Sequence, residues 1–286
     1  RQAGSQANML KIAAFLADKE LARLAGATGA EDSNGDQLAA NLLSSNVRLL
    51  GPRFSAPTSL AMVNIEGGTP SYAFYREGTA ERLVTLDKLI QNLTGEVAIF
   101  HIGSLALTGG SDASVWEEFV GKAMDKGVKV SLDPNVRPSL IAEPDVYRQR
   151  IKRLMTKVDI LKLSDEDLLW LFNDSVDESS ALSELRAIVN ADILILTQGS
   201  KGSLIWHYDK WYEAPAYPVG ELSDTVGAGD TFMASVLVWL TKNENLKRLG
   251  VIELEEKKDL QNYAGKAASL NCEKQGCNPP WESELF

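Results

Sequence analysis

The string Asp-Thr-Val-Gly-Ala-Gly-Asp-Thr-Phe at 224–232 is the part of the chain best suited to chemistry. It precedes the apolar stretch 233–240, so its small residues stand where a helix begins. Small residues let a ligand approach the backbone, and the N–H groups and dipole of a first helical turn favour negative charge. Asp230 in such a site predicts a carboxylate that accepts the proton of a hydroxyl attacking a phosphate. The alternative is a helix N-cap without a ligand.

The elements that must position this string alternate along the chain. Short apolar runs lie at 97–100, 128–132, 160–163 and 193–196, and amphipathic helical patterns lie at 113–126, 146–158 and 181–189. Strands that are apolar almost throughout are typical of a sheet covered on both faces. The order therefore predicts an α/β fold with a three-layer αβα, Rossmann-like parallel sheet.

Polar, turn-forming residues follow each predicted strand, at 101–104, 133–137, 164–167 and 197–201. Ligands of open parallel sheets bind at the carboxyl ends of the strands. We therefore expect the functional site at this edge of the sheet.

Residues 56–82 interrupt the alternation. Two strand-like segments, 58–65 and 71–75, are joined across Glu-Gly-Gly-Thr-Pro at 66–70, which predicts a hairpin. We expect this segment to form a β lid on a main domain made of residues 1–55 and 83–286. An isolated two-stranded lid is marginally stable, so it favours a homodimer in which two lids pair.

Composition excludes several classes of function. The net charge of −10 disfavours nucleic acid and anionic membranes as partners, and no apolar run approaches the length of a membrane span. Two cysteines and two histidines are too few for a typical zinc site and fit reduced thiols in a cytoplasmic protein. The acidic and basic run 253–258 predicts a solvated helix face with a Glu253–Lys257 pair.

The string 224–232 resembles the phosphate-site signature of the ribokinase-like (PfkB) carbohydrate kinases. Further segments agree in order along nearly the whole chain: 101–105, 133–138, 197–202 and 278–280 resemble family motifs, and 74–82 resembles a fructokinase lid segment. The resemblance is greatest to bacterial fructokinases. It implies an ATP-dependent sugar kinase that uses Mg²⁺, with a K⁺ site, and that phosphorylates fructose at its primary hydroxyl to give fructose 6-phosphate.

The resemblance also implies roles for matching positions. Asp230 is the expected base, and the backbone of Gly227, Ala228 and Gly229 is expected to hold the developing charge. The expected nucleotide-binding residues are Lys162, Ser164, Thr197, Gly199 and Gly202. The expected sugar- or phosphate-binding residues are Gly4, Asn8, Arg76, Asn135 and Arg137. Asp224 is expected at the K⁺ site, with carbonyls near Gly276, and Asp167 near Mg²⁺.

Several positions depart from the family pattern. The first signature, at 3–8, keeps Gly4 and Asn8 without the usual paired glycines, Ser164 and Asp167 replace Asn and Glu, and Gly265 stands where an Asn often meets adenine. Family members also begin with a central strand whose Asp binds sugar hydroxyls. We therefore expect further residues upstream of Arg1.

Two alternatives to a fructokinase remain open at the level of sequence. One is a 2-keto-3-deoxygluconate kinase, whose substrate carboxylate requires an extra cation near Arg137. The other is a kinase-like protein that has lost catalysis and acts as a binding or structural protein. The phosphate-binding loop and protein-kinase motifs are absent, so the commonest other nucleotide-binding folds are not indicated.

Overall fold

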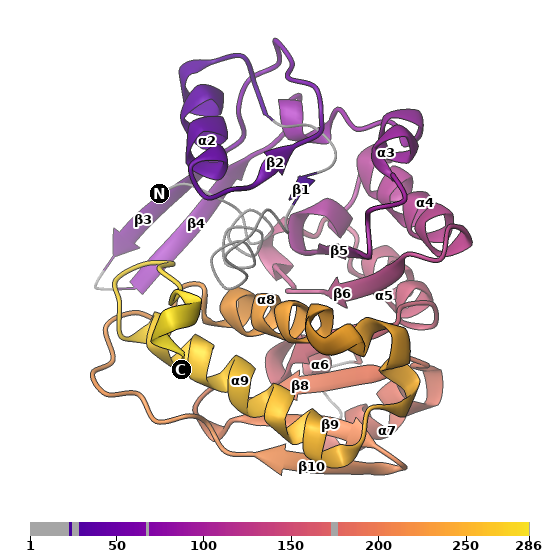
Figure 1. Ribbon diagram of the computed structural model, residues 1–286. Coiled ribbons are helices and arrows are strands. Elements are labelled where there is room, and N and C mark those ends of the chain that lie inside the picture. Colours follow the sequence, from indigo (N-terminus) through magenta and orange to yellow (C-terminus); the bar gives the residue numbers. More distant parts are fainter. Residues whose placement is uncertain (1–22, 25–28, 67–68, 173–176, 286) are drawn as a thin grey trace.

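A computed structural model describes residues 23–24, 29–66, 69–172 and 177–285 (Figure 1). Its main sheet contains six strands in the order β10-β9-β8-β7-β6-β5. The bounds of these strands are β5 Ile99–Gly103, β6 Lys129–Asp133, β7 Ile160–Ser164, β8 Ile193–Thr197, β9 Ser203–His207 and β10 Lys210–Ala214. Strands β5 to β8 are parallel, which confirms the predicted fold class.

Two helical layers cover the sheet. On one face, α4 (Ser111–Asp125), α5 (Pro144–Met155), α6 (Asp165–Leu171) and α7 (Glu178–Ile188) pack on strand residues such as Leu132, Leu161 and Leu194. On the other face, α8 (Ala228–Thr241) and α9 (Leu254–Cys272) pack on Ile160 and Ile195 (Figure 1). Successive strand residues point to opposite faces, so one uninterrupted apolar run supplies both cores.

The far edge of the sheet differs from the expected βα series. Strands β9 and β10 pair antiparallel, and β9 also runs antiparallel to β8. Tyr208 and Asp209 join them with φ of 40° and 62°, the conformation that tight hairpin turns require. Asp tolerates this conformation well, but Tyr does so less readily, and the turn is therefore hard to predict from its residue types.

The predicted hairpin is present as β3 (Leu60–Glu66) and β4 (Thr69–Tyr75), which pair antiparallel from Leu60↔Tyr75 to Glu66↔Thr69. These strands form a two-stranded sheet separate from the main one, and in Figure 1 they project from it. The other described elements are β1 Arg23–Leu24, α2 Ser33–Leu43, β2 Arg48–Leu49 and α3 Leu86–Asn92.

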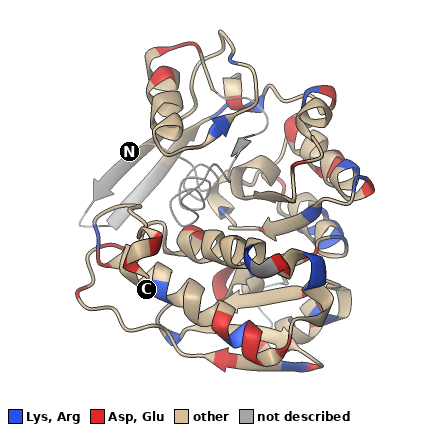
Figure 2. Ribbon diagram, viewed as in Figure 1, with Lys and Arg blue, Asp and Glu red and all other residues tan. Residues whose placement is uncertain are grey.

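One expectation about the surface is wrong. Lys257 is buried rather than paired with Glu253 on a solvated face, and its ammonium donates to the carbonyls of Asp192 and Trp206. The turn of α9 that carries Lys257 faces the sheet, where strand-end carbonyls are available as acceptors. Acidic and basic residues otherwise occur together on the helices around the sheet (Figure 2). None of the helices in the described part of the chain has the length and apolar character needed to cross a bilayer.

Candidate active site at the start of helix α8

The string 224–232 forms a tight turn into α8. Gly227 is the N-cap, with the left-handed backbone angles φ 82° and ψ 0°, and its carbonyl accepts from Thr231 N at 2.8 Å. Ala228 and Gly229 open the helix, and Asp230 lies in the first turn with 8% of its surface exposed. The carboxylate therefore lies at the positive end of a 14-residue helix dipole. This is the local geometry of an anion-binding site.

The C-terminal segment packs against the turn that leads into α8. A Cβ at Gly227 would lie 2.5 Å from Cys277 Sγ, so only glycine fits there. Asn271, near the end of α9, donates to the Val226 carbonyl at 2.9 Å and accepts from Asn278 N at 3.0 Å. These supporting roles are not visible in the sequence, because neither the side chain of Asn271 nor the thiol of Cys277 stands in a pattern that marks it.

A turn after β6 contacts Asp230 directly. Asn135 has φ 42° and donates from Nδ2 to Asp230 Oδ1 at 3.3 Å across 95 residues of sequence. Arg137 is exposed, and its Nη1 donates to the carbonyls of Asn135 and Val136 at 3.3 and 2.9 Å. The structure thus brings two of the predicted sugar- or phosphate-binding residues to the same edge as Asp230.

A buried ion pair lies beside the same turn. Lys162 Nζ and Asp133 Oδ2 are 2.9 Å apart, and each side chain is only 5% exposed. A Cβ at Gly229 would lie 3.4 Å from Lys162 Nζ, so the ammonium lies next to the first turn of α8. Burial opposes the charged form of Lys162, but the carboxylates of Asp133, Asp167 and Asp230 outweigh it and raise its pKa. The site therefore keeps a fixed positive charge next to its anion-binding backbone.

His101 lies near this lysine on β5, which β6 separates from β7 in the sheet. Its Nδ1 lies 3.0 Å from Ser131 Oγ on β6. Burial, followed by the charge of Lys162, lowers the pKa of His101 to about 3. The ring is therefore neutral at physiological pH, and its Nδ1 lies within hydrogen-bonding distance of the Ser131 hydroxyl.

The predicted nucleotide-binding residues converge on the ends of β7 and β8. Ser164 and Thr197 are register partners on these parallel strands. Gly199 and Gly202 shape the next turn with φ of 54° and 104°, and a Cβ at Gly202 would lie 2.1 Å from the Ala214 carbonyl. The turn closes through Gln198 N, which donates to Gly202 O at 2.8 Å. Conformation favours glycine at both positions, and space requires it at Gly202 alone.

The two carboxylates predicted near metals have different surroundings. Asp167 is buried, and its oxygens accept from Val136 N at 2.8 Å and Ser164 N at 3.3 Å. Burial and the nearby charge of Asp133 raise its pKa. Asp224 accepts from Val226 N and Gly276 N, each at 3.0 Å, which joins the 224–226 turn to the Gly276 segment.

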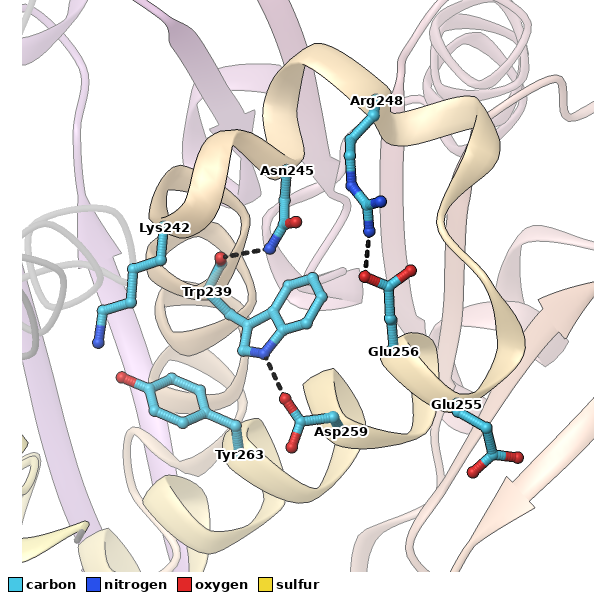
Figure 3. Close-up of a pocket in the computed structure, with 8 residues that line it drawn as sticks. All are labelled: Trp239, Lys242, Asn245, Arg248, Glu255, Glu256, Asp259 and Tyr263. Atoms are coloured by element: carbon cyan, nitrogen blue, oxygen red, sulfur yellow. Dashed lines mark hydrogen bonds and ion pairs between the residues drawn. The ribbon is translucent and has the colours of Figure 1, made fainter.

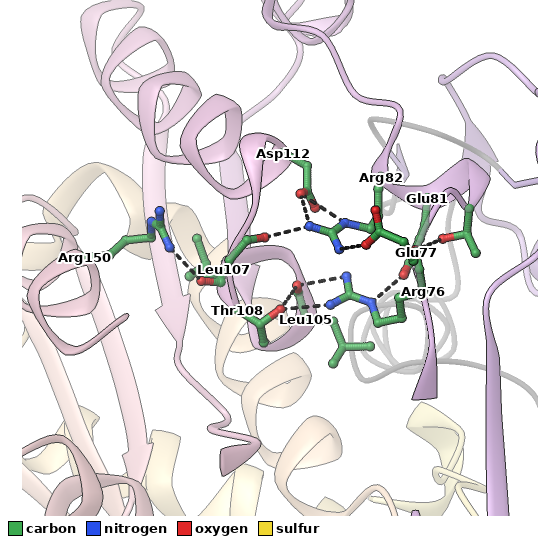
Figure 4. Close-up of polar contacts among 11 residues, drawn as sticks. Arg76, Glu77, Glu81, Arg82, Leu105, Leu107, Thr108, Asp112 and Arg150 are labelled. Carbon is green, nitrogen blue, oxygen red and sulfur yellow. Dashed lines mark hydrogen bonds and ion pairs between the residues drawn. The ribbon is translucent and has the colours of Figure 1, made fainter. Parts of the chain in front are cut away.

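Arg76 directly follows β4 at the base of the hairpin (Figure 4). Its Nε is 2.5 Å from Glu81 Oε1, and its other nitrogens donate to Thr108 Oγ1 and the Leu105 carbonyl. The arginine is thus held against the segment that follows β5. The remaining predicted residues, Gly4 and Asn8, lie outside the described residues.

A surface pocket at the other end of α8 contains none of the predicted residues (Figure 3). Trp239 lies nine residues beyond Asp230, which is about 14 Å along a helix. Several polar groups that line the pocket bond to one another: Trp239 Nε1 donates to Asp259 at 2.8 Å, and Arg248 pairs with Glu256. The chemistry therefore centres on the first turn of α8 rather than on this pocket.

Comparison with known proteins identifies the family of this chain. Residues 1–284 match the pfkB family carbohydrate kinase. A fructokinase from Rhizobium leguminosarum bv. trifolii is 34% identical over 231 residues, covering 79% of this chain and 68% of that protein. The structure of a Xylella fastidiosa fructokinase with bound ATP superposes with a TM-score of 0.85 at 24% identity, covering 99% of this chain and 88% of that one. A Vibrio cholerae O395 fructokinase in a fructose-, ADP- and calcium-bound form gives 0.77 at 21% identity, covering 96% and 86%. The match to the pfkB family extends over nearly the whole chain, and this chain belongs to the pfkB family of carbohydrate kinases.

Proposed function

We propose that this carbohydrate kinase transfers the γ-phosphoryl group of ATP to the primary hydroxyl of fructose, giving fructose 6-phosphate and ADP. The observation that carries the proposal is the first turn of α8, where Asp230 and the backbone of Gly227–Gly229 share one anion-binding turn. The choice of fructose draws on the fructokinases among the relatives, one of them 34% identical.

The reaction needs little covalent work from the protein. The sugar oxygen forms a bond to the γ-phosphorus as the bond to the ADP oxygen breaks, and the hydroxyl proton passes to Asp230. The transition state is loose in most analyses, so a carboxylate need only orient the hydroxyl and accept its proton late. Backbone N–H groups at Gly227, Ala228 and Gly229 would stabilise the charge on the transferred group. The bond from Asn135 would keep the carboxylate of Asp230 in place.

ATP would lie along the ends of β7 and β8, over Ser164, Thr197, Gly199 and Gly202. The adjacent ends of these two parallel strands and the glycine turn at 199–202 support this assignment. Lys162 would act on the phosphates as a fixed charge beside Gly229, since it is already paired with Asp133.

Mg²⁺ would neutralise phosphate charge during transfer. Asp167 suits a role without direct metal coordination, because both its oxygens already accept hydrogen bonds from backbone N–H groups and its side chain is buried. We propose that it holds metal-bound water. Asp224 joins two backbone segments, near Val226 and near Gly276, whose carbonyls suit a K⁺ ion.

Fructose would be held by Asn135, Arg137 and Arg76, together with Gly4 and Asn8 outside the described residues. We propose that residues 56–82 act as a lid over it, on a main domain of residues 1–55 and 83–286. The separate two-stranded sheet and its arginine-bound base support this division.

We also propose that two such lids pair in a homodimer. Leu60, Met62, Ala73 and Tyr75 alternate along β3 and β4, lie opposite one another in the register, and are all exposed. A small sheet with one uncovered apolar face favours a partner of the same kind. The low count of two cysteines in the sequence favours a reducing compartment, and we propose that the enzyme acts in the cytoplasm.

The test is an ADP-release assay with ATP and Mg²⁺ across a panel of sugars, with the product identified by phosphorus NMR. Fructose should give the highest kcat/KM. For sugars that lack one of its hydroxyls, kcat/KM should be lower by up to about 10⁴-fold. A higher kcat/KM for 2-keto-3-deoxygluconate would refute the choice of fructose. An absence of turnover with every sugar would refute the kinase function itself.

A further inference from the structure

In the segment between β5 and α4, the carbonyls of three alternate residues each accept a hydrogen bond from a different arginine (Figure 4). Arg76 donates to Leu105 O at 3.1 Å, Arg150 to Leu107 O at 3.3 Å and Arg82 to Gly109 O at 2.9 Å. Arg76 and Arg82 come from the base of the β3–β4 hairpin, whereas Arg150 comes from α5 on the main sheet. The segment 104–110 is therefore held between the proposed lid and the core.

Asp112 completes the attachment on the lid side. Its Oδ1 accepts from Arg82 Nη2 at 2.8 Å and from Nε at 3.2 Å, and its side chain is only 3% exposed. The arginine lies over Gly110, where a Cβ would be 1.9 Å from Nη2 and where φ is +86°. A buried carboxylate that accepts a forked pair of N–H groups fixes an arginine in both position and angle.

The same segment reaches the proposed catalytic turn from its other end. Ser104 N donates to Pro134 O at 3.0 Å, and a Cβ at Gly103 would lie 1.8 Å from Asp133 O, so the end of β5 is packed directly on the turn after β6. The next residue of that turn, Asn135, donates to Asp230. A continuous set of contacts thus runs from Arg82 through residues 104–110 to the proposed base.

We infer that Asp112 is a positioning residue for the kinase reaction. Through Arg82 it fixes the returning stem of the lid, residues 76–82, on the β5–α4 segment, and so sets how well the closed lid holds the sugar. Asp112 itself does not touch the reacting atoms. This inference rests on the proposed kinase function and extends it to a residue 118 positions away from Asp230 in the sequence.

The matched pair of variants is Asp112→Asn and Glu77→Gln. Both remove one carboxylate charge from Arg82, but Glu77 is 3.6 Å from Arg82 and its side chain is fully exposed. We expect Asp112→Asn to raise KM for the sugar about tenfold, because energetic coupling of this kind typically changes affinity by that order. KM for ATP should change less than about twofold, since the nucleotide residues lie on β7 and β8. Glu77→Gln should leave both constants within about twofold of wild type.

Hydrogen exchange without substrate provides a second measurement that needs no activity. The amides of Thr79, Ala80 and Arg82 donate to Arg76 O, Pro57 O and Thr79 O. They should exchange about tenfold faster in Asp112→Asn than in Glu77→Gln if the stem is released. Arg82→Lys, which keeps the charge and loses the fork, should show the same rise in sugar KM and serves if Asp112→Asn does not fold.

An unchanged sugar KM in folded Asp112→Asn or in Arg82→Lys would overturn the inference. So would equal changes in the KM for sugar and for ATP, which would indicate a general loss of structure. A wild-type protein without turnover would instead refute the proposed function. In that case, hydrogen exchange of residues 79–82 that is unaltered in Asp112→Asn would separately refute the inference that Asp112 holds the lid stem in place.

Discussion

Replacing Asp230 with Asn should remove most of the turnover while leaving the fold intact. Asn has nearly the same shape, and its side-chain carbonyl can still accept the 3.3 Å bond from Asn135. The variant loses the negative charge at the start of α8, which typically stabilises a helix by about 0.3–1 kcal/mol. Against a total stability of about 5–15 kcal/mol, this loss leaves the protein folded.

The effect on the reaction should be much larger. An amide cannot accept the hydroxyl proton, and loss of a positioned base typically reduces kcat about 10²–10⁴-fold, or roughly 3–5 kcal/mol of barrier. Because the barrier change exceeds the expected stability change severalfold, unfolding cannot imitate it. The assay is ADP release under saturating ATP and sugar, with melting temperature and binding of both substrates measured on the same preparation.

The control is Asp209→Asn, which makes the same chemical change in the exposed β9–β10 turn, at a left-handed position that suits Asn. It should keep turnover within about twofold, as expected of an exposed residue away from the site. Suppose that the Asp230→Asn variant folds and binds both substrates but keeps more than about a tenth of wild-type turnover. That loss would be much smaller than the loss typical of a general base, and Asp230 would not be the base.

Three further predictions test the supports of the site. Gly227→Ala should lower the free energy of unfolding, measured by urea denaturation, by about 1–3 kcal/mol, because the residue has φ +82° and the added Cβ would overlap Cys277 Sγ. The control Gly95→Ala should be near neutral, since a Cβ there would have no atom within 4 Å, and equal losses of stability in the two variants would contradict the packing argument. Lys162→Met should cost about 3–5 kcal/mol by leaving Asp133 buried and unpaired, and the double variant with Asp133→Leu should recover part of it; strict additivity in this cycle would show that the pair is not coupled. His101 should make stability fall in acid: its folded pKa, about 3, lies below the unfolded value of about 6.5, so its contribution is complete above pH 6.5 and is lost as the pH falls towards 3, by at most about 1.4 kcal/mol per pH unit. In denaturation curves between pH 4 and 7, His101→Gln should show a shallower pH dependence than wild type, and an identical slope would contradict the assignment.

The sequence determined the local elements well because their signals are local. The apolar runs predicted at 160–163 and 193–196 became β7 and β8 with one added residue each, and the helix predicted at 113–126 became α4 at Ser111–Asp125. Side-chain periodicity, glycine placement and the small residues before 233–240 act within a few positions of one another. The anion-binding turn at Gly227–Asp230 belongs to this class, since its conformation follows from its own residues.

Tertiary structure alone decided which groups support that turn and how they are charged. Asn135 meets Asp230 across 95 residues, Cys277 closes on Gly227 across 50, and Lys162 pairs with Asp133 on the neighbouring strand. Lys257 resembled a surface lysine in its run of charges, yet the rotation of α9 on the sheet turned it towards buried carbonyls. Contacts of this kind depend on how helices and strands are packed, and one turn of a helix or one strand position changes the partner of every side chain on it.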